Sequence, residues 1–115
     1  RQVSGTYLSS LKFGANCRNR EFSITPEDIW EIYLKQDMKC ALSGEEIVFN
    51  RKYYKDSSLQ TASVDRIDST RGYTKDNIQI VHKDINMLKQ AYKQEDFIRM
   101  CQKVADYQKQ KDKNK

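Results

Sequence analysis

The stretch Asp65–Lys89, DRIDSTRGYTKDNIQIVHKDINMLK, decides the predicted fold because two strands, a loop and a helix meet within it. The segment Thr61–Ile67 overlaps the start of this stretch, and its side chains alternate between the two sides of a half-buried strand. Turn-forming residues follow, and Asn77–Val81 is a second short strand rich in β-branched side chains. His82–Ala91 then fits a short helix, whose expected buried residues are Ile85, Met87 and Leu88.

The flanking segments predict helices on both sides of this hairpin. One helix is expected over Thr6–Arg20, and a second begins after Thr25, whose side chain can cap it ahead of Pro26. The last helix is expected over Gln94–Gln110. The residues expected to face inward are Ile29, Trp30, Tyr33 and Leu34 in the second helix and Phe97, Met100, Cys101 and Val104 in the last. The fold class is therefore α+β, with a helical region at 1–38, a core at 39–91, and a C-terminal helix with a basic tail at 92–115.

Composition limits the classes of function. The chain has 115 residues, enough for one domain, and it starts at Arg1 rather than methionine, which suggests a piece of a longer protein. No run approaches the ~20 apolar residues of a transmembrane helix, so no membrane partner is expected. A net charge of +5 is compatible with nucleic acid as the partner. Three scattered cysteines argue against a disulfide framework and favour a reducing, cytoplasmic location.

Two oxygen-bearing side chains are candidates for a metal site. If the hairpin packs on the helix, the carboxylate of Asp65 and the amide oxygen of Asn86 face one point. Mg²⁺ prefers such hard oxygen donors and keeps much of its hydration shell. An Asp and an Asn occur together in many places that bind no metal, so their order and spacing carry the argument.

That order and spacing resemble the HNH, or ββα-metal, nuclease motif. The motif has Asp-His at a strand end, a loop glycine, an Asn, and then Cys-x-x-Cys-Asn-x-x-Lys entering a helix. The matching positions here are Asp65, Arg66, Gly72, Asn77, His82, Ile85, Asn86 and Lys89. The sequence D-R-I-D at 65–68 is similar to that of the phage and mobile-element branch of the family. The match covers about a quarter of the chain.

The resemblance implies a ββα-metal core that hydrolyses DNA phosphodiester bonds. Asp65 and Asn86 are expected to hold one Mg²⁺ or Mn²⁺. Asn77 is expected to pin the loop, and Lys89 to support the phosphate or the helix end. Asp68 is expected either as an acceptor behind the metal ligands or as an extra ligand.

The chain departs from the family at Arg66. The family has a histidine there as the general base, whereas a guanidinium with a pKa above about 12 does not accept a proton near neutral pH. Arg66 is expected to contact a phosphate instead. The base then comes from a metal-bound hydroxide, from His82 or a tyrosine, or is absent; the tyrosines are Tyr53, Tyr54 and Tyr73. His82, the single histidine, is either a displaced base or metal ligand, or a strand-end residue paired with its neighbours.

The upstream segment Cys40–Gly44 resembles the turn that binds zinc in such relatives, within a predicted hairpin over 39–49. The two cysteine pairs of the relatives read Cys40-x-x-Ser43 and His82-x-x-Ile85 here. Two plausible ligands do not hold structural zinc, which takes four nitrogen or sulfur donors. We therefore expect no structural zinc, and a Cys40–His82 contact as a remnant.

Basic residues around the predicted site favour contact with DNA phosphates. The loop over 50–60 also interleaves basic and aromatic side chains, which suits phosphate contact combined with base stacking. The residues expected to contact DNA are Arg18, Arg20, Arg51, Lys52, Arg66, Arg71 and Lys89.

Three functions remain open from the sequence. A metal-dependent endonuclease would cut DNA only with Mg²⁺ or Mn²⁺. A DNA-binding module with a decayed site would bind with a strong salt dependence and never cut. A domain of a larger effector complex would be inert alone and active in its context.

Overall fold

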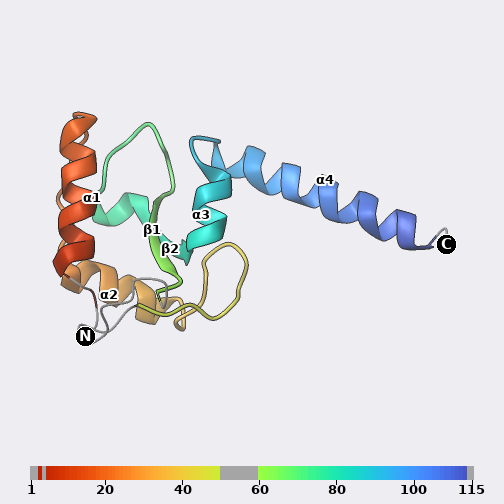
Figure 1. Ribbon diagram of the computed structural model, residues 1–115, viewed down its shortest axis with the longest axis horizontal. Helices are drawn as coiled ribbons and strands as arrows, with labels where there is room; N and C mark the ends of the chain where they lie inside the picture. Colours follow the sequence, from red (N-terminus) through yellow and green to blue (C-terminus); the bar gives the residue numbers. More distant parts are fainter. Residues whose placement is uncertain (1–2, 4, 50–59, 114–115) are drawn as a thin grey trace.

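A hairpin and three helices form the body of the protein, and the last helix extends away from it (Figure 1). The computed structural model describes residues 3, 5–49 and 60–113. The elements in chain order are α1 (Gly5–Cys17), α2 (Pro26–Lys35), β1 (Ala62–Arg66), the 3-10 turn η2 (Lys75–Asn77), β2 (Ile78–His82), α3 (Lys83–Lys89) and α4 (Gln94–Lys113). The described part is therefore α+β, with four helices and one antiparallel hairpin, and this level of the prediction is confirmed.

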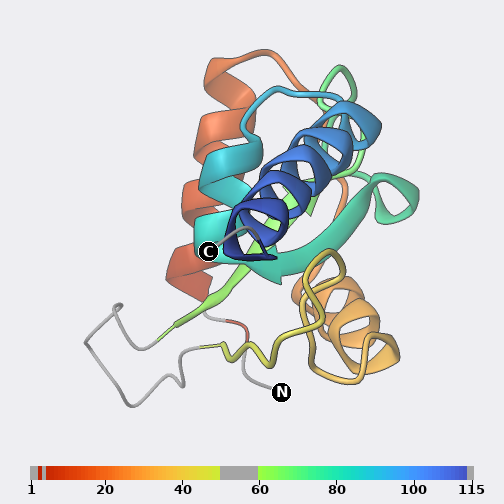
Figure 2. The same ribbon diagram turned by 90° about the vertical axis from the view of Figure 1, so that its right-hand side faces the viewer.

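The hairpin has one apolar and one largely polar face. β1 and β2 pair so that Val64 lies opposite Ile80 and Asp65 opposite Gln79. Because side chains alternate along a strand, each such pair shares a face. Val64 and Ile80 are buried in the core, which side chains of α1 and α2 complete. α3 lies on the opposite side of the hairpin from α1 (Figures 1 and 2) and bonds to the polar face.

Side chains satisfy the open edges of the two strands. A two-stranded hairpin leaves backbone groups unpaired along both edges. The Tyr7 hydroxyl accepts a hydrogen bond from the Val64 amide at 2.7 Å. On the other edge, the Gln36 amide donates to the Ile80 carbonyl at 2.7 Å and accepts from the Ile80 N–H at 3.0 Å. α1 and the end of α2 thus take the place of further strands.

The start of α2 is the one predicted from its capping residues. Thr25 Oγ1 accepts from the Asp28 amide, and Asp28 Oδ2 accepts from the Thr25 amide, both at 3.1 Å. Ile29 and Tyr33 are buried, and the Tyr33 hydroxyl donates to the Ile47 carbonyl at 2.6 Å. Leu34 is exposed, contrary to the prediction, because the turn that buries Ile29 and Tyr33 points it toward solvent.

Two predicted helix faces are right only in part, since Ile85 in α3 packs partly buried against the core as expected but its predicted companions do not. In α3, Met87 and Leu88 are 69% and 65% exposed, and the residue that is fully buried is Lys89. In α4, Phe97 is buried, but Met100, Cys101 and Val104 are exposed because no described part of the chain covers that face. Cys101 is therefore a surface thiol and not a core residue.

The segment over 39–49 forms less structure than a hairpin. Lys39 and Glu46 make a single antiparallel bridge, while Cys40, Ile47 and Phe49 enter the core. The loop residues Arg51, Lys52, Tyr53 and Tyr54 lie outside the described residues. No helix in the described ranges has both the length and the apolar composition needed to cross a bilayer.

Candidate functional site

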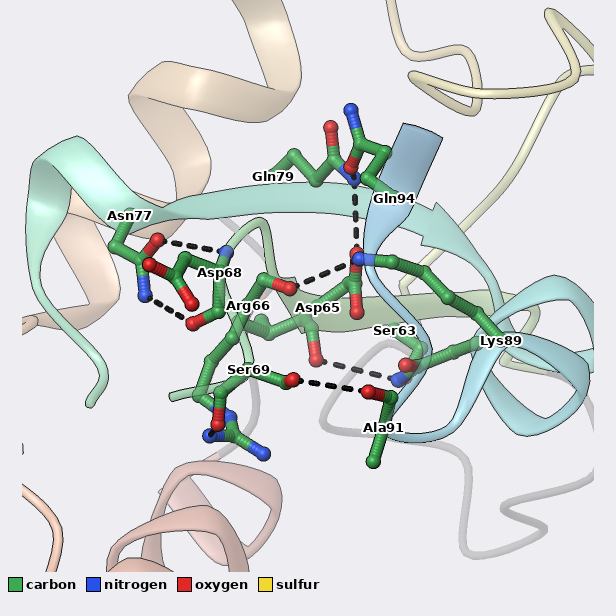
Figure 3. A network of polar contacts seen from close by, with 12 residues as sticks. Ser63, Asp65, Arg66, Asp68, Ser69, Asn77, Gln79, Lys89, Ala91 and Gln94 are labelled. Atoms are coloured by element: carbon green, nitrogen blue, oxygen red, sulfur yellow. Dashed lines mark hydrogen bonds and ion pairs between the residues drawn. The ribbon is translucent and has the colours of Figure 1, made fainter. Parts of the chain in front are cut away.

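A buried ion pair occupies the polar face of the hairpin (Figure 3). Asp65 is 4% exposed, and Lys89, at the end of α3, is 0% exposed. Lys89 Nζ donates to Asp65 Oδ2 at 2.6 Å and to the Arg66 carbonyl at 2.9 Å. Gln79, opposite Asp65 on β2, donates to the same Oδ2 at 2.8 Å. Asp65 Oδ1 accepts no hydrogen bond from any residue in the described ranges.

Asn86 reaches the same strand from the same helix. Its Nδ2 donates to Ser63 Oγ at 2.7 Å and to the Val64 carbonyl at 3.3 Å. With this nitrogen held against β1, the Asn86 amide oxygen receives no hydrogen bond from the described part of the chain. The structure therefore holds the Asn86 side chain against Ser63 and Val64, which precede Asp65 on β1, and no described residue donates to one oxygen of Asn86 or to one oxygen of Asp65.

The sequence predicts that Lys89 supports either the phosphate or the helix end, and its contacts agree with the second of these roles. Its ammonium is enclosed, so it cannot reach a DNA phosphate without breaking the pair with Asp65. Lys89 instead fixes the Asp65 carboxylate and ties the end of α3 to the backbone of β1. The pair with Asp65 was not predicted, because a lysine in a short helix is normally a surface residue.

The donor types fit a divalent cation only in part. Mg²⁺ is commonly held by one or two protein oxygens together with water and phosphate, and Asp65 and Asn86 offer two. The described residues contain no cluster of three or more His, Cys, Asp or Glu side chains. The Lys89 ammonium beside Asp65 also opposes a second cation by Coulomb repulsion. A phosphate bound at the same place would offset that repulsion and supply the missing oxygens.

Asn77 holds the loop between the strands. It is 1% exposed, accepts from the Asp68 amide at 2.9 Å, and donates to the carbonyls of Asp68 and Gly72 at 3.0 and 2.9 Å. This is the position expected for it. Asp68 itself stays exposed, and its carboxylate accepts from the Thr70 hydroxyl and amide, which lowers the pKa of Asp68. The Asp68 carboxylate thus bonds within the loop, and neither of these hydrogen bonds is to Asp65.

Arg66 braces this loop from inside. Its Nη1 donates to the carbonyls of Ser69 and Arg71 at 2.5 and 3.0 Å, and its guanidinium lies 5.5 Å from the centre of the Tyr73 ring. The other guanidinium nitrogens donate to none of the described residues. Arg66 can therefore hold the loop and still offer N–H groups to a phosphate.

Arg20 lies within electrostatic reach of both Arg66 and Arg18, and we call these three the arginine cluster. Partial burial, followed by repulsion from Arg66 and Arg18, lowers the pKa of Arg20. Within the described ranges, no carboxylate pairs with any of the three. Like charges without counter-charges repel, so this arrangement attracts an anion. Arg71 differs, because its guanidinium is already paired with Asp76 at 2.8 Å on the surface.

His82 lies away from Asp65. It ends β2 opposite Ala62, three register steps from the Asp65–Gln79 pair, which is about 10 Å along a strand. Its Nδ1 accepts from the Asp84 amide at 3.1 Å and so caps the start of α3. The structure does not bring His82 to the candidate site, and this placement matches the strand-end role.

The turn at Cys40 is held by hydrogen bonds to sulfur. Burial raises the pKa of the Cys40 thiol, but hydrogen bonds from Ser43 and from the amides of His82 and Leu42 outweigh it and lower the pKa. The Ser43 amide donates to Sγ at 3.4 Å. The expected Cys40–His82 contact thus exists, and it runs through the His82 backbone rather than the imidazole.

Gln79 and Gln94 are site residues that sequence reasoning missed. Gln79 Nε2 bridges Asp65 Oδ2 and Gln94 Oε1, the latter at 2.7 Å, and so connects the ion pair to the first residue of α4. The strand register was the available signal, because it places Gln79 directly opposite Asp65. Comparisons with known protein families, curated proteins and solved structures found no match for this chain.

Proposed function

We propose that this protein is a metal-dependent nuclease of the ββα-metal type that hydrolyses phosphodiester bonds in DNA. One observation carries the proposal: α3 brings Asn86 to Ser63 and Val64 and Lys89 to Asp65, and no described residue donates to the second oxygen of Asp65 or to the amide oxygen of Asn86. The arginine cluster supports it, since it places uncompensated positive charge around Arg66, the residue that follows Asp65.

In this mechanism the residues of the chain divide the work. Asp65 and Asn86 would hold one Mg²⁺ or Mn²⁺, which when bound stabilises negative charge on the scissile phosphate and the leaving oxygen. Lys89 and Gln79 orient the Asp65 carboxylate. Arg66 and Arg20 would bind phosphate oxygens through guanidinium N–H groups that donate to none of the described residues. Arg66 cannot be the base and His82 is distant, so the candidates that remain among the described residues are a metal-bound hydroxide and Tyr73, whose ring centre lies 5.5 Å from the Arg66 guanidinium.

Cleavage with and without metal tests the proposal. Plasmid DNA is expected to be nicked or cut with Mg²⁺ or Mn²⁺ and to stay intact with EDTA. Asn86→Ala is expected to lower the cleavage rate about hundredfold, because one of two protein ligands is removed. Asn16→Ala, an exposed site on α1, is the matched control and should cut at the wild-type rate. Equal rates for the two variants, or equal cutting in EDTA, would contradict the assignment.

A second candidate is a DNA-binding module that does not cut. The observation that favours it is the Lys89–Asp65 pair, because the carboxylate already has a fully buried cation as its partner. Binding to DNA without cutting under any metal condition would support this candidate. Cutting that appears only after further proteins are added would support a domain of a larger effector complex.

Both candidates require the arginine cluster to bind phosphate. Arg20→Ala is expected to weaken DNA binding and to reduce the slope of log K against log salt by about 1, as for the loss of one phosphate contact. Arg99→Ala removes an exposed arginine that is paired with Asp96 on α4, and it should leave the slope unchanged. Fluorescence anisotropy over a salt series measures the DNA affinity and its salt slope for both variants. Identical slopes would show that the arginine cluster does not contact DNA.

A further inference from the structure

α4 carries an apolar stripe that nothing in the described chain covers. The helix has 20 residues and projects from the body along the long axis of the molecule (Figures 1 and 2). Phe97, in its first turns, is its single buried residue among those described. Beyond it Val104 and Tyr107 are 61% and 59% exposed, and Met100 and Cys101 are exposed as well.

The spacing of the stripe is that of a helix that packs against another helix. Phe97, Met100, Val104 and Tyr107 follow one another at steps of three, four and three residues. This is the a and d pattern of a heptad, which forms a narrow seam along one side of a helix. Cys101 lies beside the seam at an e position, and the charged residues of α4 lie outside it until Lys111.

A helix of this length that lacks tertiary contacts is only marginally stable. Isolated helices of ordinary composition are marginal in water, and most helical stability in proteins comes from burying an apolar face. The part of α4 beyond its first turns has no described neighbour that provides such burial. A partner along the seam supplies it.

Charge identifies that partner as a second copy of the same helix, running the other way. The first turn of α4 is acidic, with Glu95 and Asp96, whereas its end is basic, with Lys109, Lys111 and Lys113. Two copies side by side in the same direction would place like charges together at both ends. In the opposite direction, the acidic end of each copy meets the basic end of the other. The bodies then lie at opposite ends of a pair about 30 Å long, so they do not collide.

We propose that α4 is an antiparallel dimerisation helix whose occupant is α4 of a second copy. Met100 of each copy then lies opposite Val104 of the other, and Tyr107 lies near the turn of the other copy that carries Phe97. The two Cys101 thiols come close together at the centre of the pair.

Sedimentation of the full chain across a range of protein concentrations tests the dimer. Wild type is expected to be a reversible dimer, and Val104→Lys is expected to raise the dissociation constant more than about tenfold, since each dimer loses two buried valines. Lysine favours helices more than valine does, so a weaker helix would not explain the loss. Gln102→Lys adds the same charge on the opposite side of α4, next to Asp106, and should dimerise like wild type.

Cross-linking tests the direction. In a Cys17→Ser background, which removes the other exposed thiol, a short bismaleimide is expected to join Cys101 to Cys101. A chain that stays monomeric at every concentration would overturn the proposal. Slow amide exchange of α4 in that monomer would then indicate that another part of the same chain covers the seam. A dimer that survives Val104→Lys, or one whose Cys101 thiols do not cross-link, would also overturn it.

Discussion

Lys89→Met is expected to lower the free energy of unfolding by about 3–5 kcal/mol, since it leaves the Asp65 carboxylate buried without its partner. Both side chains are almost completely enclosed, so solvent cannot take the place of the lost ammonium. The variant also leaves the Arg66 carbonyl without its donor. Urea unfolding followed by circular dichroism measures the effect, with Lys83→Met as the control because Lys83 is an exposed lysine of the same helix.

A double variant separates the lost charge pair from lost packing. In Asp65→Asn/Lys89→Met no charge remains buried, and the amide that replaces the carboxylate keeps an oxygen that can accept from Gln79. The double variant is therefore expected to be more stable than Lys89→Met alone by about 1–2 kcal/mol. If the single and double variants unfold at the same urea concentration, the pair does not hold α3 to β1.

This pair also changes how a cleavage experiment is read. Asp65→Ala removes a metal ligand in the proposed mechanism, and it also leaves a buried ammonium without its counter-charge. Loss of cutting by that variant would follow from either effect. Asn86→Ala leaves no charge unpaired, since Asn86 bonds only to the Ser63 hydroxyl and the Val64 carbonyl within the described chain. Asn86 is therefore the cleaner site for testing catalysis.

Local patterns predicted the elements of this fold, and tertiary contacts decided which faces they bury. The alternation of Thr61–Ile67 and the cap at Thr25 are local signals, and β1 and α2 lie where those signals place them. In α3, periodicity predicted that Met87 and Leu88 are buried. The polar side of the helix packs against the polar face of the hairpin instead, and those two residues are exposed. That outcome depends on Asp65 and Gln79 sharing a face, which is visible only once the register is known.

The candidate site was predictable in its parts and not in its connections. Asp65, Asn77 and Asn86 were selected by type and spacing, and the structure places them on or beside the hairpin. The arginine cluster joins residues 46 or more positions apart, since Arg18 and Arg20 follow α1 while Arg66 ends β1. For α4, periodicity correctly showed which side is apolar, but it cannot show what covers that side.

Gly72→Ala is the second large effect expected, a loss of about 3 kcal/mol in the free energy of unfolding. Gly72 approaches the backbone of Glu21 so closely that a Cβ would lie 2.7 Å from the Glu21 nitrogen and nearer still to its carbonyl oxygen. Neither side can yield cheaply, because both are main chain. The approach exists because Phe22 and Tyr73 form a parallel bridge, in which the Tyr73 amide donates to the Glu21 carbonyl at 2.8 Å and the Ser23 amide donates to the Tyr73 carbonyl at 2.9 Å.

Loss of the Phe22–Tyr73 bridge would disturb the arginine cluster and also lower the free energy of unfolding. Tyr73 lies against the Arg66 guanidinium, and the Phe22–Tyr73 bridge joins the loop to the segment that carries Arg20. Gly72→Ala is therefore expected to weaken DNA binding together with stability. Gly14→Ala is the matched control: its new Cβ would meet only the flexible end of Arg18 at 3.2 Å, and alanine inside α1 should add about 0.5–1 kcal/mol. If Gly72→Ala unfolds at the wild-type urea concentration, the loop does not lie against Glu21 in solution, and the link between the loop and the arginine cluster is lost with it.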